Sequence, residues 1–130
     1  MGKTVAVIGA SNDRRKFGNR AVRAFLAEGY TVFPVNSHET SVEGVAAYTS
    51  VLDVPGSIDM ATVYVPPDVG RTLLSEFARK GIAEVWFNPG SESDRIAEEG
   101  RQLGLNVVFA CSIIGMGRLA KGGGGTGSPA

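Results

Sequence analysis

The stretch TVAVIGASNDRRKFG, residues 4–18, decides the fold. Its first five residues are β-branched or apolar and do not alternate with polar residues, which is typical of a strand buried on both faces of a parallel sheet. Gly9 and Ala10 then end the strand with almost no side chain, and turn-forming residues, three cations and a helical pattern follow. A strand, a turn and a helix N-terminus in this order predict an anion site, because backbone N–H groups and the positive end of the helix dipole point to one place.

We interpret this stretch as a phosphate-binding turn for a nucleotide. The three consecutive cations, Arg14, Arg15 and Lys16, favour that interpretation. The alternative is an ordinary strand-to-helix turn whose cations are only solvated. The turn is not a Walker A loop, since no Gly-Lys-Ser/Thr sequence closes it. It also lacks the G-x-G-x-x-G spacing of a dinucleotide-binding loop.

Composition narrows the class of protein. The chain has 130 residues, with 13 Lys plus Arg balancing 13 Asp plus Glu, so it is long enough for one packed domain. Zero net charge argues against a general nucleic-acid binder. The one cysteine, Cys111, and the one histidine, His38, exclude an intrachain disulfide and a Cys- or His-rich metal site. No apolar run is long enough to cross a membrane and no leader pattern is visible, so we expect a cytoplasmic protein.

Periodicity divides the chain into alternating strands and helices. We expect strands at residues 4–8, 31–35 (ending near Pro34), 59–65, 84–87 and 106–109. We expect helices at residues 19–28 and 92–103, and a third that starts at Pro66-Pro67 and ends at Gly81. Residues 36–43 should be a surface loop, residues 45–48 a short extra strand and residues 50–54 a helical turn. The domain should span residues 1–120, and the Gly-rich residues 121–130 should be a disordered tail.

This alternation predicts an α/β domain with a Rossmann-like, doubly wound, mostly parallel open sheet of about five to six strands. Right-handed crossovers place the first strand in the middle, with the second strand on one side and strand 59–65 on the other. The gap between the first strand and strand 59–65 is then the topological switch point, where ligands bind outside the carboxyl ends. The turn at residues 10–17 and the sequence Val65-Pro66-Pro67 border this gap.

The end of the second strand indicates which nucleotide to expect. An NAD site places an acidic residue there to bind the ribose hydroxyls. This chain instead reads Asn36-Ser37-His38, with no carboxylate before Glu39 and no arginine nearby for a phosphorylated ribose. A small NAD(P)-binding oxidoreductase or redox-sensing module is therefore the alternative rather than the first hypothesis.

Several motifs together resemble a known family. They are V-x-V-I-G-A-S-N-D at residues 5–13, K-F-G at 16–18, F-P-V-N at 33–36, E-G-V-x-A-Y at 43–48, V-P-P at 65–67, W-F-N-P-G at 86–90 and A-C-S-I at 110–113. The pattern is similar to the stand-alone CoA-binding domain proteins. These in turn are similar to the N-terminal CoA-binding domain of succinyl-CoA synthetase α subunits and of ADP-forming acyl-CoA synthetases. The resemblance covers residues 4–115.

The resemblance implies that coenzyme A, or an acyl-CoA, lies across the switch point. The turn after the first strand then holds the phosphates, residues after the second strand take the adenosine, and Val-Pro-Pro lines the nucleotide or the pantetheine arm. Members of the family usually read Asn-Pro-Lys after the second strand, so a lysine is missing here and the cations of the first turn are expected to substitute. With the turn after strand 84–87, the candidate ligand-binding residues are Gly9, Ala10, Ser11, Asn12, Arg14, Arg15, Lys16, Gly18, Asn36, Ser37, His38, Val65, Pro66, Pro67, Asn88 and Pro89.

No catalytic set emerges from the sequence. The synthetases that this chain resembles carry their phosphohistidine and ATP-binding domain in further sequence. We therefore predict a module that binds a small-molecule nucleotide without catalysis of its own, and neither a nucleic acid nor a membrane. Cys111 either forms a mixed disulfide with the CoA thiol or is a small buried residue. A regulatory module that has lost its ligand is a third hypothesis.

Overall fold

The computed structural model describes residues 3–115 of the chain, and the predicted tail lies outside them. The strands of the main sheet are β1 (Thr4–Ile8), β2 (Thr31–Val35), β5 (Met60–Val63), β6 (Glu84–Phe87) and β7 (Asn106–Phe109). A hairpin is formed by β3 (Ser41–Val42) and β4 (Val45–Ala46), and a short 3₁₀ helix, η1, covers Val51–Asp53. The helices are α1 (Phe17–Ala27), α2 (Pro67–Thr72), α3 (Leu74–Lys80) and α4 (Asp94–Gln102).

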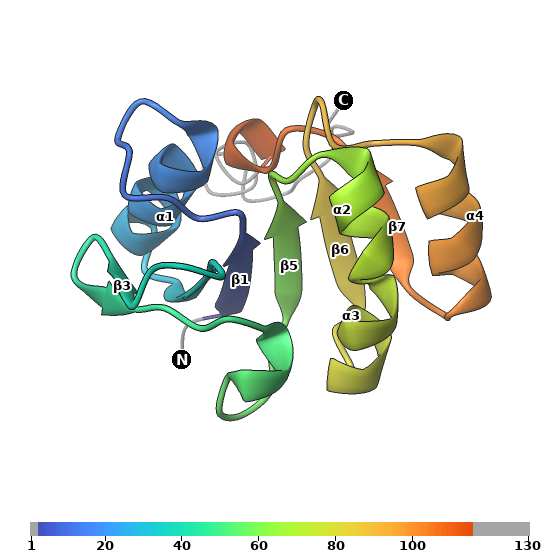
Figure 1. The fold of residues 1–130 in the computed structure, drawn as a ribbon, viewed down its shortest axis with the longest axis horizontal. Helices are drawn as coiled ribbons and strands as arrows, with labels where there is room; N and C mark the ends of the chain where they lie inside the picture. Colours follow the sequence, from blue (N-terminus) through green and yellow to red (C-terminus); the bar gives the residue numbers. More distant parts are fainter. Residues whose placement is uncertain (1–2, 116–130) are drawn as a thin grey trace.

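The main sheet has five parallel strands in the order β2-β1-β5-β6-β7. Strand β1 lies between β2 and β5, so the predicted arrangement around the first strand is confirmed. Figure 1 shows the strands pointing in one direction, with the β1–α1 turn and the start of α2 at their carboxyl ends. The Rossmann-like α/β class predicted from the alternation is confirmed as well.

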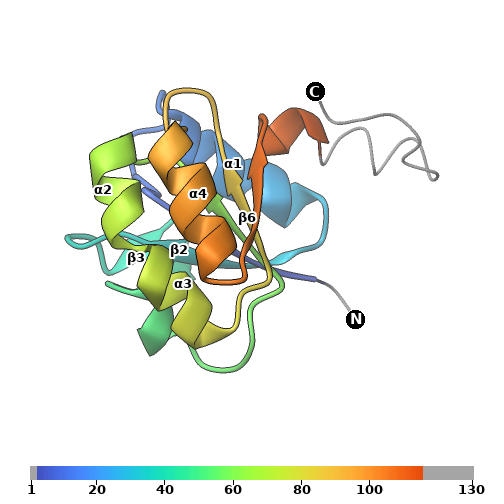
Figure 2. The ribbon, with the colours of Figure 1, turned by 90° about the vertical axis from the view of Figure 1, so that its right-hand side faces the viewer.

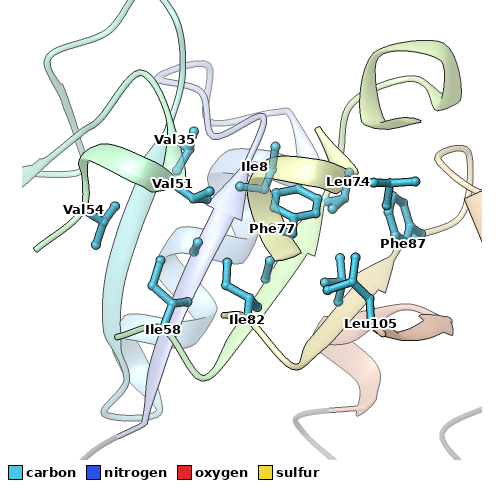
Figure 3. Close-up of a cluster of buried hydrophobic side chains, with 14 of the residues drawn as sticks. Ile8, Val35, Val51, Val54, Ile58, Leu74, Phe77, Ile82, Phe87 and Leu105 are labelled. Atoms are coloured by element: carbon cyan, nitrogen blue, oxygen red, sulfur yellow. The ribbon is translucent and has the colours of Figure 1, made fainter. Parts of the chain in front are cut away.

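Two buried clusters lie on opposite faces of the sheet. Val5 and Val7 point to the face covered by α1, where they pack with Phe25. Ala6 and Ile8 point to the other face, which α2, α3 and α4 cover. The alternation of side chains along β1 therefore serves two cores, which explains why this strand shows no polar residue. Figures 2 and 3 show the helices on the two faces and the larger cluster, respectively.

Several predicted elements differ in the structure. The strand expected at residues 59–65 is shorter, because β5 covers only Met60–Val63, and the first helix begins at Phe17 rather than at residue 19. Strand β2 has the predicted range, Thr31–Val35, and continues one residue past Pro34, near which its end was expected. The carbonyl of Pro34 accepts a hydrogen bond from Tyr48 on the outer side of this edge strand (2.9 Å), so the missing proline N–H costs no bond to β1. Residues 36–43 contain part of a hairpin, whose turn residues Glu43 and Gly44 both have positive φ, at 50° and 77°.

The helix predicted after Pro66-Pro67 is divided at Leu73 into α2 and α3. The hydroxyl of Thr72 donates to the carbonyl of Val69 (2.6 Å), and the N–H of Leu73 bonds three residues back to Gly70. Both bonds tighten the chain at this point. Val69, in α2, is 44% exposed.

Candidate functional site

Two adjoining pockets lie at the carboxyl ends of β1, β2 and β5. The larger, which we call the α1 pocket, has a volume of about 540 Å³ and lies over the N-terminus of α1. The smaller, the α3 pocket, has a volume of about 220 Å³ and lies between the end of β2 and α3. Gly9, Asn36 and Val65 line both pockets, so the two adjoin at these residues, and we call the pair the hollow. It lies at the predicted switch point.

The structure brings many of the predicted residues to this hollow and leaves others outside it. The α1 pocket is lined by the predicted residues Gly9, Ala10, Ser11, Lys16, Gly18, Asn36, Val65, Pro66 and Pro89. Ser37 lines the α3 pocket. Asn12, Arg14, Arg15, His38, Pro67 and Asn88 line neither. The sequence interpretation missed the pocket-lining residues Phe17, Tyr64 and Glu76, whose positions depend on tertiary packing rather than on a local motif.

Gly9 and Gly18 allow α1 to begin directly against the end of β1. Gly9 has φ +89°, a conformation that residues with a side chain rarely adopt. A Cβ atom on Gly18 would overlap the carbonyl oxygen of Gly9. Glycine at both positions therefore lets the backbone approach closely and brings the first turn of the helix to the floor of the α1 pocket.

The N-terminus of α1 opens into this pocket without an internal partner. Its N-cap residue, Lys16, makes no side-chain capping hydrogen bond, and no acidic residue lies in the first turn. Within residues 3–115, the backbone N–H groups of Phe17 and Gly18 find no protein acceptor. These two donors and the positive end of the helix dipole are thus available to an anion in the pocket.

The three predicted cations have different surroundings. The guanidinium of Arg15 pairs with Asp13 at 3.0 Å and that of Arg14 with Glu43 at 3.3 Å. The hydrogen bond from Arg15 is the main reason why the pKa of Asp13 is lowered to about 2. Lys16 lines the α1 pocket and, within the described part of the chain, forms no ion pair. Of the three cations, Lys16 is therefore the one that lines the α1 pocket without a carboxylate partner in the described residues.

Glu43, at the tip of the β3–β4 hairpin, holds the turn after β1 in place. The fully buried carboxamide of Asn19 donates to Glu43 Oε2 and to the carbonyl of Ser11, both at 2.9 Å. This hydrogen bond from Asn19, followed by the charge of Arg14, lowers the pKa of Glu43. The turn is thus fastened to α1 and to the hairpin before any ligand binds, which keeps the pocket preformed.

Asn36 also acts within the protein. Its carboxamide donates to the carbonyl of Ala10 (2.7 Å) and accepts from the N–H groups of His38 (2.6 Å) and Glu39 (3.0 Å). These contacts join the loop after β2 to the turn after β1, so Asn36 shapes the boundary between the two pockets. The side chain of Asn12 is likewise engaged, with Glu39 and with a backbone carbonyl of β3.

Asn88 belongs to a buried polar network behind the α1 pocket. Its carboxamide donates to Thr62 Oγ1 (2.7 Å) and accepts from the N–H of Ser112 (2.8 Å). The hydroxyl of Ser112 in turn contacts Thr62 (2.7 Å) and the phenol of Tyr64 (3.1 Å). Burial raises the pKa of Tyr64. This network fixes the wall that carries Tyr64, Pro89 and Gly90.

Cys111 is half-buried. It lines a third hollow of about 530 Å³, together with Phe17, Ile113 and Ile114. Phe17 also lines the α1 pocket, so the two hollows meet at this residue. In residues 3–115 there is no group of three His, Cys, Asp or Glu side chains that could hold a metal ion. None of the helices in this part of the chain has the length and apolar character needed to cross a membrane.

Comparison with known proteins gives a consistent result. The model of a family described as "CoA binding domain" matches residues 3–116. The chain is 42% identical over 113 residues to the α subunit of the ADP-forming acetate–CoA ligase II of Pyrococcus furiosus, a match that covers 86% of this chain and 24% of that protein. The chain thus spans about a quarter of the length of this curated relative.

Two solved structures share the fold. One is a conserved hypothetical protein from Pyrococcus furiosus, with 32% identity, a TM-score of 0.81 and coverage of 88% of this chain and 98% of that one. The other is the dinucleotide-forming acetyl-coenzyme A synthetase 1 of Ca. Korarchaeum cryptofilum in complex with phosphate and ADP. It has 27% identity, a TM-score of 0.72 and coverage of 81% of this chain and 25% of that one.

Proposed function

The chain belongs to the CoA binding domain family, and we propose that it binds coenzyme A or an acyl-CoA in the hollow formed by the α1 and α3 pockets. The observation that carries this proposal is the unpartnered N-terminus of α1, which opens beside Lys16 into a preformed pocket. A pyrophosphate fits such a place, because backbone N–H groups, the helix dipole and a lysine all favour negative charge there.

The rest of the ligand follows from the shape of the hollow. From the pyrophosphate, the adenosine extends into the α3 pocket, whose walls include Val35, Val51 and Leu73. In the other direction, the pantetheine arm runs along Val65 and Pro66 to the ring of Phe17. The volume of the α1 pocket lies within the usual range for ligand sites, roughly 300–1,000 Å³.

We propose that this domain binds its ligand without reacting with it. The pocket-lining side chains comprise one lysine and one glutamate among hydroxyl, amide and apolar groups, and a nucleophile paired with a base is not found among them. The curated ligase relative is about four times as long as the matched segment. In proteins of that length the domain would hold the carrier while other segments perform the chemistry.

Calorimetric titration tests the proposal. We expect saturable one-to-one binding of CoA and acetyl-CoA, with an affinity that falls as salt rises because charges contribute to it. NAD and NADP serve as competing ligands. If NAD or NADP binds and neither CoA, acetyl-CoA nor dephospho-CoA does, the function is that of the oxidoreductase alternative. If none of the five binds, the regulatory module without a ligand is the better description.

A further inference from the structure

The α3 pocket contains a carboxylate that no motif in the sequence indicates. Glu76, in the first turn of α3, lines this pocket, as does Ser37 from the loop after β2. Of all the residues lining the pocket, Glu76 alone carries a charge. One of its oxygens, Oε1, accepts a hydrogen bond from the hydroxyl of Ser50 at 2.6 Å. The second oxygen, Oε2, has no protein donor within residues 3–115.

The position of Glu76 is fixed by the fold. Ser50 is the N-cap of η1, and its hydroxyl also accepts from the N–H of Leu52 (3.1 Å). Helix α3 packs on η1, and Phe77, next to Glu76, is 1% exposed. Figure 3 shows Phe77, Val35 and Val51 in the same buried cluster, and all three also line the α3 pocket. The carboxylate is therefore held at the rim of the pocket by a buried neighbour and a capped turn.

The remaining polar groups of this pocket suit hydroxyl groups rather than a phosphate. Ser37 supplies a hydroxyl, whereas the hydroxyl of Thr49 donates to Asp53 (2.9 Å) and the carboxamide of Asn36 is engaged within the protein. A carboxylate accepts hydrogen bonds from a ribose diol, as in dinucleotide-binding folds, and repels a phosphate on the same ring. Here the carboxylate comes from α3, across the pocket, instead of from the end of β2.

We propose that the α3 pocket selects nucleotides whose adenosine ribose carries free 2′- and 3′-hydroxyls, and that Glu76 is the residue that sets this selectivity. This inference rests on the proposed function for where the adenosine lies. It deepens that function by naming the ligand class: the chain prefers the dephospho form of the carrier to the form with a 3′-phosphate. Glu76 Oε2 accepts from the ribose, while Lys16 and the α1 amides hold the pyrophosphate at the other end.

The test measures two matched ligand pairs by calorimetry, dephospho-CoA against CoA and NAD against NADP. In each pair the two ligands differ by one phosphate on the adenosine ribose. We expect the unmodified protein to bind dephospho-CoA at least as tightly as CoA. In Glu76→Gln the preference for the free ribose should fall roughly two- to fivefold, the size of a partly exposed charge contact.

Glutamine keeps an oxygen that can accept from Ser50, so Glu76→Gln should unfold at the same temperature as the unmodified protein. Glu98→Gln is the control variant, because Glu98 is exposed on α4 and lines neither pocket. It should leave all affinities unchanged.

Tighter binding of CoA than of dephospho-CoA by the unmodified protein overturns the inference and leaves the proposed function intact. An equal change of both affinities in Glu76→Gln also overturns it. If CoA and dephospho-CoA both fail to bind while NAD is preferred to NADP in a Glu76-dependent way, the proposed function fails and the inference stands. If no ligand of either pair binds, both are rejected.

Discussion

Lys16→Gln separates a ligand-binding cation from the cations that only stabilise the turn. Lys16 is exposed, lines the α1 pocket and makes no capping hydrogen bond, so its loss should leave the helix unchanged. In Arg15→Gln the same charge is removed one residue earlier, from a guanidinium whose side chain is 90% exposed and paired with Asp13. The two variants change the net charge of the protein equally, so they differ only in the position of the lost cation.

The expected magnitude follows from the exposure of Lys16. An exposed charge contact contributes roughly 0.2–1 kcal/mol, and the helix N-terminus with its free N–H groups remains in the variant. We therefore expect Lys16→Gln to weaken CoA binding about two- to fivefold at moderate salt, with less effect at high salt because the lost contact is screened. Arg15→Gln should change the affinity less than about twofold, because the guanidinium of Arg15 is paired with a carboxylate of the protein itself.

Calorimetry at two salt concentrations is the assay, with thermal unfolding to confirm that both variants fold. If Arg15→Gln weakens CoA as much as Lys16→Gln does, the net charge of the turn matters and the position of Lys16 does not. If neither variant changes the affinity or its salt dependence, the pyrophosphate does not lie over the N-terminus of α1. Either result would refute the assignment of Lys16 as the phosphate-binding cation.

Other predictions concern the stability of the site. Gly18→Ala should destabilise the fold by about 2 kcal/mol or more, because the new methyl group overlaps a backbone carbonyl. The control is Gly100→Ala, where the methyl group meets a movable valine side chain. Thermal unfolding should show a smaller loss of stability for this control. The pKa of Asp13, about 2 in the folded state, lies below its unfolded value, so its contribution to stability is present at neutral pH and lost as pH falls toward 2. NMR titration should show the pKa of Asp13 rising in Arg15→Gln, and an unchanged pKa would contradict this pairing. Asn88→Leu should cost about 2–4 kcal/mol in denaturant unfolding, because it leaves buried polar partners unpaired; a loss below 1 kcal/mol would show that the network relaxes.

The fold was largely predictable because its signals are local. The strands β1, β6 and β7 have the predicted bounds, since each is a short apolar run ended by a glycine, an asparagine or a chain reversal. The place of β1 between β2 and β5 followed from the right-handed crossovers, whereas no position was predicted for β6 and β7. The errors have two sources: a contact between separate segments at β2, and a local side-chain bond in the helix after Pro66-Pro67. Pro34 can lie inside β2 because its carbonyl faces outward and accepts from Tyr48. The hydroxyl of Thr72, which bonds to the carbonyl of Val69, accompanies the break in the second predicted helix.

The electrostatics of the site was less predictable than its location. Three consecutive cations suggested one charged patch, but nothing in residues 14–16 shows which of them finds a carboxylate elsewhere. The partner of Arg14, Glu43, comes from a hairpin that the sequence pattern presented as a surface loop. Sequence gives the charge of a turn, whereas the distribution of that charge depends on contacts between segments far apart in the chain.

The same limit applies to the choice of nucleotide. The sequence has no acidic residue directly after Val35. This argues against binding of a ribose with free hydroxyls only if the acidic residue must come from the end of β2. In the folded chain the α3 pocket is closed by α3 and η1, and the break at Leu73 is where α3 begins. Glu76 therefore reaches the same pocket from the opposite wall. Binding of a ribose depends on where the carboxylate lies in the pocket and not on which element supplies it. The selectivity for ribose or phosphoribose must therefore be judged from the residues that line the pocket. For that reason the ratio of affinities for ligands that differ by one ribose phosphate is more informative about this site than the motif after its second strand.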